Sequence, residues 1–166
     1  MMKIVLAEVR PEDQAAILQL GESVNEANVV PYLNPQGQQE MRIARVKDIT
    51  QASDPKIYCS LKALVDQRLV GYIAWRHGNY IAQLYVRSEY QGYGIGRRLV
   101  EGMLARCSAE SIQLKASVNA LGFYEKLGFK PLSTEQSRNG IRFVPMELKL
   151  NPETPLPHSK RKADDR

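Results

Sequence analysis

The chain carries the run Tyr90-Gln91-Gly92-Tyr93-Gly94-Ile95-Gly96-Arg97-Arg98 directly after an apolar stretch, 80–86, that predicts a strand. Apolar residues at helical spacing after this run predict an amphipathic helix that extends to about Ala109. Glycines at a strand-to-helix turn let the backbone approach a ligand without Cβ clashes. The N–H groups of the first helical turn and the helix dipole favour an anion, and the two arginines add charged donors. The run therefore predicts a phosphate-binding loop.

Two familiar phosphate loops do not fit this run. A nucleotide P-loop needs Gly-Lys followed by Ser or Thr, and that sequence does not occur in the chain. The dinucleotide fingerprint needs a third glycine where the chain has Arg97. The next predicted strand, 111–116, is followed by Ser117 and has no acidic residue to hold a ribose. The pattern that remains is Gln91-x-x-Gly94-x-Gly96.

This pattern resembles the pyrophosphate-binding signature of the GNAT superfamily of acetyl-CoA-dependent N-acetyltransferases. A second stretch, Phe123-Tyr124-Glu125-Lys126-Leu127-Gly128-Phe129, resembles a later helix end of the same family, and it lies one strand after the long helix. Two motifs in the right order and spacing make a stronger signal than either alone. The resemblance covers residues 10–150 and is most specific between Leu84 and Phe129.

Composition predicts one globular domain without metal or disulfide staples. The chain has 166 residues, of which 43% are hydrophobic and 25% charged. No apolar run approaches the roughly 20 residues of a membrane span, and no secretory signal precedes the first strand, so we expect a cytoplasmic protein. Cys59 and Cys107 form no C-x-x-C pair, so we expect no structural zinc. The net charge of +5 suits nucleic acid or a polyanionic small ligand such as CoA, and the arginines beside the glycine loop favour the latter.

The order of predicted elements is β-α-α-β-β-β-α-β-α-β-β. They are a strand at 3–9, a helix from 10, a loop at 25–37, a helix at 38–50, antiparallel strands at 57–65, 69–75 and 80–86, the long helix, a strand at 111–116, a helix at 120–127, and a closing hairpin of 132–134 with 141–150. The resemblance implies an α/β (α+β) fold, a GNAT-like mixed, mostly antiparallel central sheet with helices on both faces. Residues 1–150 form this domain, and residues 151–166, with three prolines and charges of both signs, are expected to be a disordered tail.

The resemblance also implies the residues that bind acetyl-CoA as co-substrate. Backbone groups of the strand before the loop would bond the pantetheine arm and the acetyl carbonyl, the loop would bind the pyrophosphate, and two residues after the next strand would bond the CoA arm. These residues are Leu84, Tyr85, Val86, Gln91, Gly92, Tyr93, Gly94, Ile95, Gly96, Arg97, Arg98, Ser117 and Asn119. An alternative for Ser117 is that it caps the following helix together with Asn119.

Tyr124 matches the family tyrosine that acts as the acid toward the CoA sulfur, and a phenol with a pKa of ~10 suits that role. Phe123 is predicted to pack on the sheet instead. The base is open, because the strand position where many family members carry an acid is Gln83. Glu22 and Glu26 near the first helix end are candidate bases, a water chain is another, and His77 is expected on the surface.

Three classes of function compete. The first is an N-acetyltransferase that acts on a small-molecule or peptide amine by direct attack in a ternary complex, because no activated Cys or Ser is evident; Cys107 is expected in the core. The second is a non-catalytic acyl-CoA-binding sensor or partner-binding module, which Gln83 favours and Tyr124 opposes. The third class, a nucleic-acid-binding protein, rests on net charge alone, so no nucleic acid is expected as a partner. We also expect no membrane and no metal. The resemblance implies that the acceptor binds between residues 25–39, with Tyr32, and residues 135–142. A monomer and a homodimer are both compatible with the chain.

Overall fold

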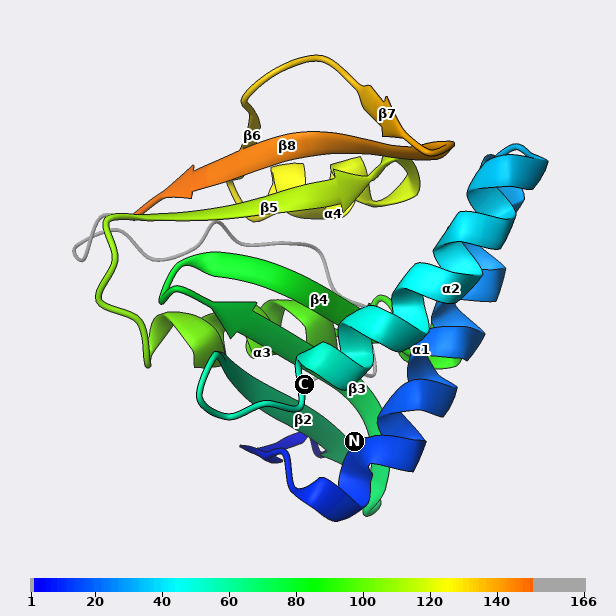
Figure 1. Cartoon of the computed structure of the whole chain (residues 1–166). Helices are drawn as coiled ribbons and strands as arrows, with labels where there is room; N and C mark the ends of the chain where they lie inside the picture. The colour runs from blue at the N-terminus through cyan, green and yellow to red at the C-terminus, as the bar shows by residue number, and fades with distance from the viewer. Residues whose placement is uncertain (1, 151–166) are drawn as a thin grey trace.

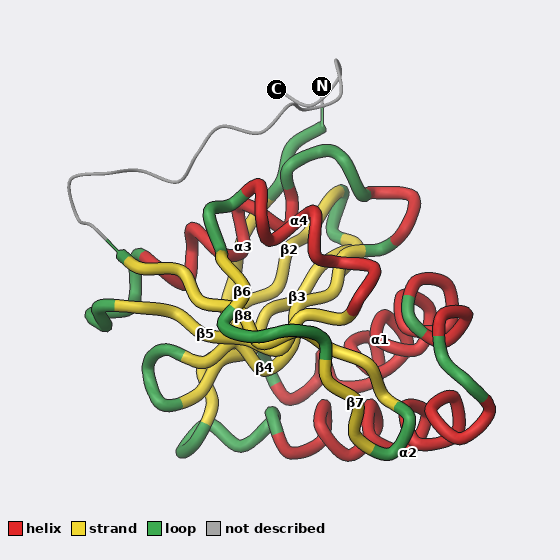
Figure 2. Tube along the Cα trace, turned by 90° about the horizontal axis from the view of Figure 1, so that it is seen from above, coloured by secondary structure: helices red, strands yellow, loops and turns green. Residues whose placement is uncertain are grey.

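In the computed structural model, which describes residues 2–150, one mixed sheet runs through the molecule and is covered by helices on both faces (Figures 1 and 2). The strand order is β1-β2-β3-β4-β5-β8-β6, with β7 paired to β8 beside this path. The strands are β1 Val5–Glu8, β2 Tyr58–Val65, β3 Arg68–Arg76, β4 Tyr80–Val86, β5 Ser111–Ser117, β6 Lys130–Pro131, β7 Gln136–Arg138 and β8 Ile141–Lys149. The helices are α1 Gln14–Asn28, α2 Pro35–Gln51, α3 Ile95–Leu104 and α4 Leu121–Lys126. The predicted fold class and order of elements are confirmed, with the first strand of the closing hairpin divided in two.

The sheet opens between β4 and β5. These two strands are parallel, and they pair only at Tyr80 with Gln113 and at Ile81 with Leu114. The neighbouring ladders continue past this point, β3–β4 to Val86 and β5–β8 to Ser117. The backbone of β4 beyond Ile81 therefore has no strand partner on its β5 side, and the sheet is split at this point.

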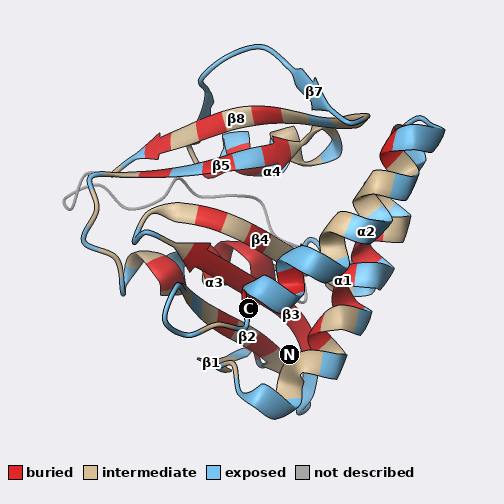
Figure 3. Ribbon diagram, in the orientation of Figure 1, coloured by how far each residue is buried: buried red, intermediate tan, exposed pale blue. Residues whose placement is uncertain are grey.

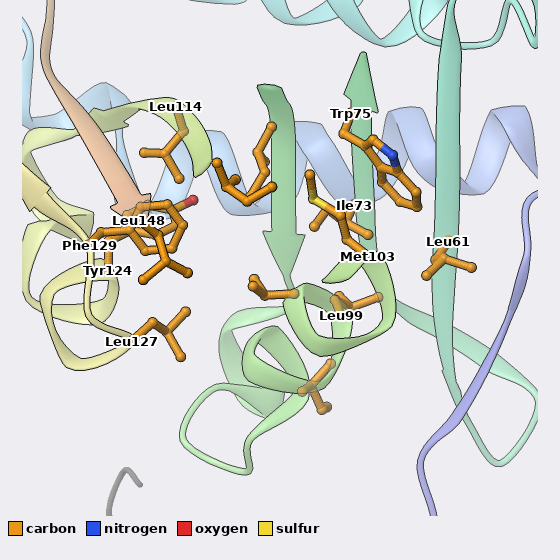
Figure 4. Packing of buried hydrophobic residues seen from close by; sticks show 14 of the residues in the cluster. Leu61, Ile73, Trp75, Leu99, Met103, Leu114, Tyr124, Leu127, Phe129 and Leu148 are labelled. Atoms are coloured by element: carbon orange, nitrogen blue, oxygen red, sulfur yellow. The ribbon is translucent and has the colours of Figure 1, made fainter. Parts of the chain in front are cut away.

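The core fills both faces of the split sheet. On one face, Leu99 and Met103 of α3 pack on β2 and β3, where Leu61 and Ile73 are fully buried (Figure 4). The same cluster continues across α4 to β5 and β8, so it joins strands β1 to β4 to the strands on the other side of the opening (Figure 3). On the other face, α1 and α2 cover a second cluster around Tyr72 and Ala74. Of these two clusters, only the first has members on both sides of the opening between β4 and β5, so this packing holds the two sides together.

The predicted loop at 25–37 is wrong for most of its length. The α1 helix continues to Asn28, and α2 begins at Pro35. The Asn34 side chain accepts a hydrogen bond from the Gly37 N–H at 2.8 Å, and Pro35 occupies the first helical turn, where its missing N–H costs nothing. Asn and Pro, which the sequence analysis interpreted as loop residues, are therefore the start signal of a helix.

The long helix is shorter than predicted. It ends at Leu104 instead of about Ala109, because its last turn tightens into i to i−3 bonds from Arg106 N to Met103 O and from Cys107 N to Leu104 O. Cys107 consequently lies beyond the helix and is half-buried at the edge of the core, with its thiol 2.8 Å from the Gly78 carbonyl oxygen. The prediction that it is a core residue was wrong.

The closing hairpin also differs. Its first strand, β7, is 136–138 instead of 132–134, and the two-residue turn to β8 is made by Asn139 and Gly140, both with positive φ (53° and 83°).

The tail predicted at 151–166 lies outside the described residues. No helix within 2–150 is long and apolar enough to cross a bilayer.

The tip of this hairpin touches the start of α2, which places the two acceptor-side segments side by side (Figure 1). A Cβ on Gly37 would lie 2.1 Å from the backbone oxygen of Gly140. Alanine normally stabilises a helix relative to glycine by about 1 kcal/mol. We expect Gly37→Ala to destabilise the protein by about 1–3 kcal/mol instead, since a backbone atom must move.

Gly122 of α4 is the matched control, because a Cβ there meets nothing within 4 Å. Gly122→Ala should therefore leave stability unchanged or raise it by up to about 1 kcal/mol. Thermal and urea unfolding of both variants in the absence of ligand give the comparison. Equal or increased stability of Gly37→Ala would show that α2 and the hairpin do not touch in solution.

Candidate functional site

The site is built on the unpaired edge of β4. Arg87 N–H donates to Val70 O at 2.9 Å, and bonds alternate along an antiparallel ladder, so Tyr85 and Gln83 bond toward β3. Leu84 and Val86 then present their backbone groups away from β3, into the opening. The Gln91 side chain confirms this direction for Val86, because its amide donates to the Val86 carbonyl at 3.0 Å. Leu84 thus presents a backbone donor and acceptor on a strand edge without a strand partner.

The N-terminus of α3 lies next to this edge. Gly92 and Gly94 have φ of 88° and 83°, which turn the chain sharply from strand to helix. The first bond of the helix runs from Arg98 N to Gly94 O, and no side chain caps the helix, so the N–H groups of Ile95 and Gly96 point out of its end. This arrangement provides oriented donors and a favourable dipole for an anion.

Gly96 is required for close packing. A Cβ at this position would lie 2.8 Å from the Phe123 ring. Phe123 itself is 38% exposed and lines the cavity described below, so the prediction that it packs on the sheet was wrong. The buried member of the Phe-Tyr pair is Tyr124, because α4 turns that side chain inward toward β5 and β8.

The two arginines of the loop have different places. Arg97 is only 6% exposed, lines the cavity, and has its Nε 3.7 Å from the Glu101 carboxylate. Arg98 does not line the cavity, because its guanidinium donates to the Ile4 carbonyl at 3.2 Å. Tyr93 also lies outside the cavity lining. The structure therefore brings all predicted cofactor residues except Tyr93 and Arg98 to one cavity.

This cavity of about 1170 Å³ continues from the loop, through the opening between β4 and β5, to the space under α2 and the β7–β8 turn. Ser117 and Asn119 line it beside α4. Ser117 sits at the N-cap position of the turn before α4, but its side chain makes no capping hydrogen bond. The capping alternative for Ser117 therefore has no support in the structure.

Tyr124 lies at the middle of the cavity. Its ring packs edge-on against Phe123 and Phe129, with ring centroids 5.1 and 5.5 Å away, and is surrounded by Leu114 and Leu127 (Figure 4). Burial raises the pKa of the phenol well above its ordinary value, and the nearby Tyr85 raises it further. The phenol therefore stays protonated at neutral pH, so it can donate a proton or a hydrogen bond there.

The candidate bases at the end of α1 do not reach the cavity. Glu26 is held by hydrogen bonds from Arg42 and Arg45, which lower its pKa to about 2, and neither Glu22 nor Glu26 lines the cavity. Such a carboxylate is a poor proton acceptor at neutral pH. His77 is exposed on the β3–β4 turn, as expected.

The carboxylates that do line the cavity come from α2. Within the described chain these are Glu40 and Asp48, and sequence reasoning missed both. The predicted helix 38–50 already placed Glu40, Ala44 and Asp48 on one face by their spacing, but spacing alone did not show that this face meets the cavity. Residues 2–150 contain no cluster of three or more His, Cys, Asp or Glu side chains placed to hold a metal.

Comparison with known proteins assigns the family. The family model described as "Acetyltransferase (GNAT) domain" matches residues 29–150, most of the chain. The chain therefore belongs to the GNAT family of acetyltransferases. No curated protein sequence matches the chain significantly.

Solved structures agree with this fold. A GCN5-related N-acetyltransferase from Rhodopseudomonas palustris superposes with a TM-score of 0.75 at 24% identity, covering 90% of this chain and 98% of that one. The PaiA N-acetyltransferase from Thermoplasma acidophilum, solved with coenzyme A, gives 0.71 at 21% identity, covering 90% and 100%. The aminoglycoside 6′-N-acetyltransferase from Enterococcus faecium gives 0.61 at 17% identity, covering 90% and 99%.

Proposed function

We propose that this protein transfers an acetyl group from acetyl-CoA to the primary amine of a small molecule or peptide, by direct attack in a ternary complex in the cytoplasm. The observation that carries the proposal is the coincidence of three features at one cavity. These features are the unpaired edge of β4, the uncapped N-terminus of α3 and the buried phenol of Tyr124. Coenzyme A is bound in the solved structure of the PaiA acetyltransferase, which supports the choice of ligand.

The residues present fit acetyl-CoA. The loop from Gln91 to Arg97 supplies N–H groups and one cationic side chain for a pyrophosphate, and Ser117 supplies a hydroxyl for the CoA arm. The backbone of Leu84 supplies unpaired strand groups for the pantetheine amides. When bound, acetyl-CoA supplies an acetyl thioester.

The protein groups have distinct tasks in this reaction. A backbone N–H on the open edge of β4 stabilises the charge that develops on the acetyl oxygen. Tyr124, which burial keeps protonated, donates to the departing sulfur. The lining of the cavity supports direct attack by the amine, because neither Cys59 nor Cys107 belongs to it.

The alternative, a non-catalytic acyl-CoA sensor, has one observation in its favour. Gln83 lines the cavity at the β4 position where, by the family resemblance, many members carry an acid, and a carboxamide cannot accept a proton. Detection of free thiol from acetyl-CoA in the presence of a library of primary amines separates the two functions. An acetyltransferase releases thiol in proportion to an accepted amine, whereas a sensor binds acetyl-CoA without amine-dependent release.

The two loop arginines provide an internal test of the binding mode. We expect Arg97→Ala to weaken CoA binding by up to about tenfold and to reduce its dependence on salt, because single ion pairs contribute roughly 0–1 kcal/mol. Arg98→Ala should leave CoA affinity unchanged, since that side chain bonds the Ile4 carbonyl. Calorimetric titrations at low and moderate salt give both values. If Arg98→Ala weakens binding and Arg97→Ala does not, the pyrophosphate does not lie where we place it.

A further inference from the structure

Gln83 has an unsatisfied polar atom inside the cavity. It lies on β4 opposite Ala74, on the face of the sheet that α2 covers, and is only 7% exposed. Among the described residues, its side-chain oxygen Oε1 is the one buried side-chain polar atom without a hydrogen-bond partner. A buried acceptor without a donor is unfavourable, so such an atom calls for a partner from outside the protein. An N–H-bearing ligand group supplies that partner.

Asp48 of α2 faces the same stretch of β4. Burial raises the pKa of Tyr80 and of Tyr85, which lie on either side of Gln83, and the nearby Asp48 carboxylate adds to the rise of both. Its carboxylate makes no hydrogen bond or ion pair with any residue in 2–150, and its side chain is open to the cavity. Partial burial raises its own pKa, while the nearby cations Lys47 and Arg76 oppose that rise. A carboxylate and an amide oxygen, both acceptors, thus line the cavity beside the same stretch of β4, and a primary ammonium, with three donors, matches them.

Arg76 is held rigidly at the end of β3. Its Nη1 donates to the Tyr58 hydroxyl at 2.9 Å, and its guanidinium lies 4.7 Å from the centre of the Tyr80 ring. It lines the cavity and has no carboxylate within ion-pair distance among the described residues. A guanidinium fixed in this way is prepared to bind an anionic group through paired N–H donors.

The other charges that line the cavity agree. Lys47, Lys115 and Arg138 also line it and make no ion pair within the described chain, against the two carboxylates Glu40 and Asp48. The cavity lining is therefore positively charged overall, and it repels a polycation and attracts a molecule with an anionic group.

We propose that the acceptor is a small primary amine that also carries an anionic group, with its ammonium at Asp48 and Gln83 and its anion at Arg76. This inference rests on the proposed function and names its substrate class. Asp48 takes one proton from the ammonium and releases it to solvent through the open cavity. The neutral nitrogen then forms the C–N bond as the C–S bond breaks. Tyr124 gives its proton to the sulfur and receives a second proton from the nitrogen. The net products are an acetamide, a free thiol and one proton released to solvent.

The test measures acceptor binding by calorimetry to protein saturated with CoA, so that it does not depend on turnover. The probes are glycine, β-alanine, 4-aminobutyrate and lysine, each compared with its carboxamide, together with O-phosphoethanolamine and the polycation spermidine. We expect at least one anionic amine to bind tenfold or more tightly than its uncharged counterpart and than spermidine. A preference for the phosphate over the carboxylates identifies the anion as phosphate and supports the same class.

Two variants assign the roles. Arg76→Gln should remove the preference for the anionic member of each pair, whereas Asp48→Asn should weaken all amines by about tenfold and keep the preference. Arg68→Gln, which removes a charge from the exposed other end of β3, is the control and should bind like wild type. The inference is overturned if carboxamides or spermidine bind as well as the anionic amines, if no probe binds, or if Arg76→Gln keeps the preference. Acetyl-CoA affinity measured on the same samples shows whether the proposed function fails as well.

Discussion

Replacement of Gly94 by glutamate is expected to abolish measurable binding of CoA. Gly94 has a φ of 83° and precedes the first residue of α3, so its own backbone forms the turn at the helix N-terminus. A side chain there strains the backbone by about 1–2 kcal/mol and fills the space that a pyrophosphate needs. Its carboxylate would also occupy the positive end of the helix dipole and repel phosphate. We expect a loss of affinity greater than about a hundredfold in calorimetry.

Gly78→Glu is the matched control for this change. Gly78 also has a positive φ, 74°, but it lies in the β3–β4 turn, and a Cβ there meets nothing within 4 Å. The control therefore carries the same backbone strain and the same added charge away from the α3 N-terminus. Circular dichroism on both variants establishes that each is folded. Unchanged CoA affinity in folded Gly94→Glu would remove the loop from the binding site.

Tyr124→Phe is expected to lower kcat by about 10²-fold while CoA affinity stays close to wild type. The change removes only the hydroxyl, so the ring keeps its edge-on contacts with Phe123 and Phe129. A proton donor to the sulfur acts in the transition state, so its loss reduces kcat more than binding. Burial raises the pKa of this phenol, so ionisation of Tyr124 should not lower the wild-type rate before the pH passes about 10.

Tyr72→Phe provides the control for the loss of a buried hydroxyl. Tyr72 lies on β3 beneath α1, burial raises its pKa as well, and it does not line the cavity. Its variant should keep wild-type kcat. Free-thiol release at several pH values, with the best accepted amine, measures both variants. If Tyr124→Phe retains wild-type kcat at every pH, the phenol has no part in proton transfer.

The part of the site that the sequence predicted is the part made by contiguous residues. The strand 80–86 was predicted with its observed bounds, and the glycine loop and the Phe-Tyr helix could be placed because backbone geometry determines their residues. Gly94 and Gly128 both have positive φ, which explains why the chain has glycine there. Short motifs of this kind keep their meaning without knowledge of tertiary structure.

The acceptor side could not be predicted in the same way. It is assembled from α2, the end of β3 and the β7–β8 turn, which meet only in the folded chain. Asp48 lay inside the predicted helix 38–50, but nothing in the sequence showed which face of that helix meets the cavity. The pairing of Arg76 with Tyr58 and Tyr80 depends on the register of three strands. Arg97 and Arg98 are adjacent in sequence, yet the helix turns one into the cavity and the other toward Ile4. Side-chain direction, which sequence spacing does not fix at a helix start, decides between them.

We infer that this chain moves an acetyl group from acetyl-CoA to an amine in the cavity between β4, β5 and α3. To test this, the wild-type protein and Gly94→Glu are incubated with acetyl-CoA and the amine library, and free thiol is recorded together with the mass of each amine. We expect thiol release that depends on an accepted amine, a product heavier by one acetyl group, and neither of these with Gly94→Glu. Tight acetyl-CoA binding by the wild type, with no amine gaining an acetyl group, would show that the protein is an acyl-CoA sensor and not an acetyltransferase.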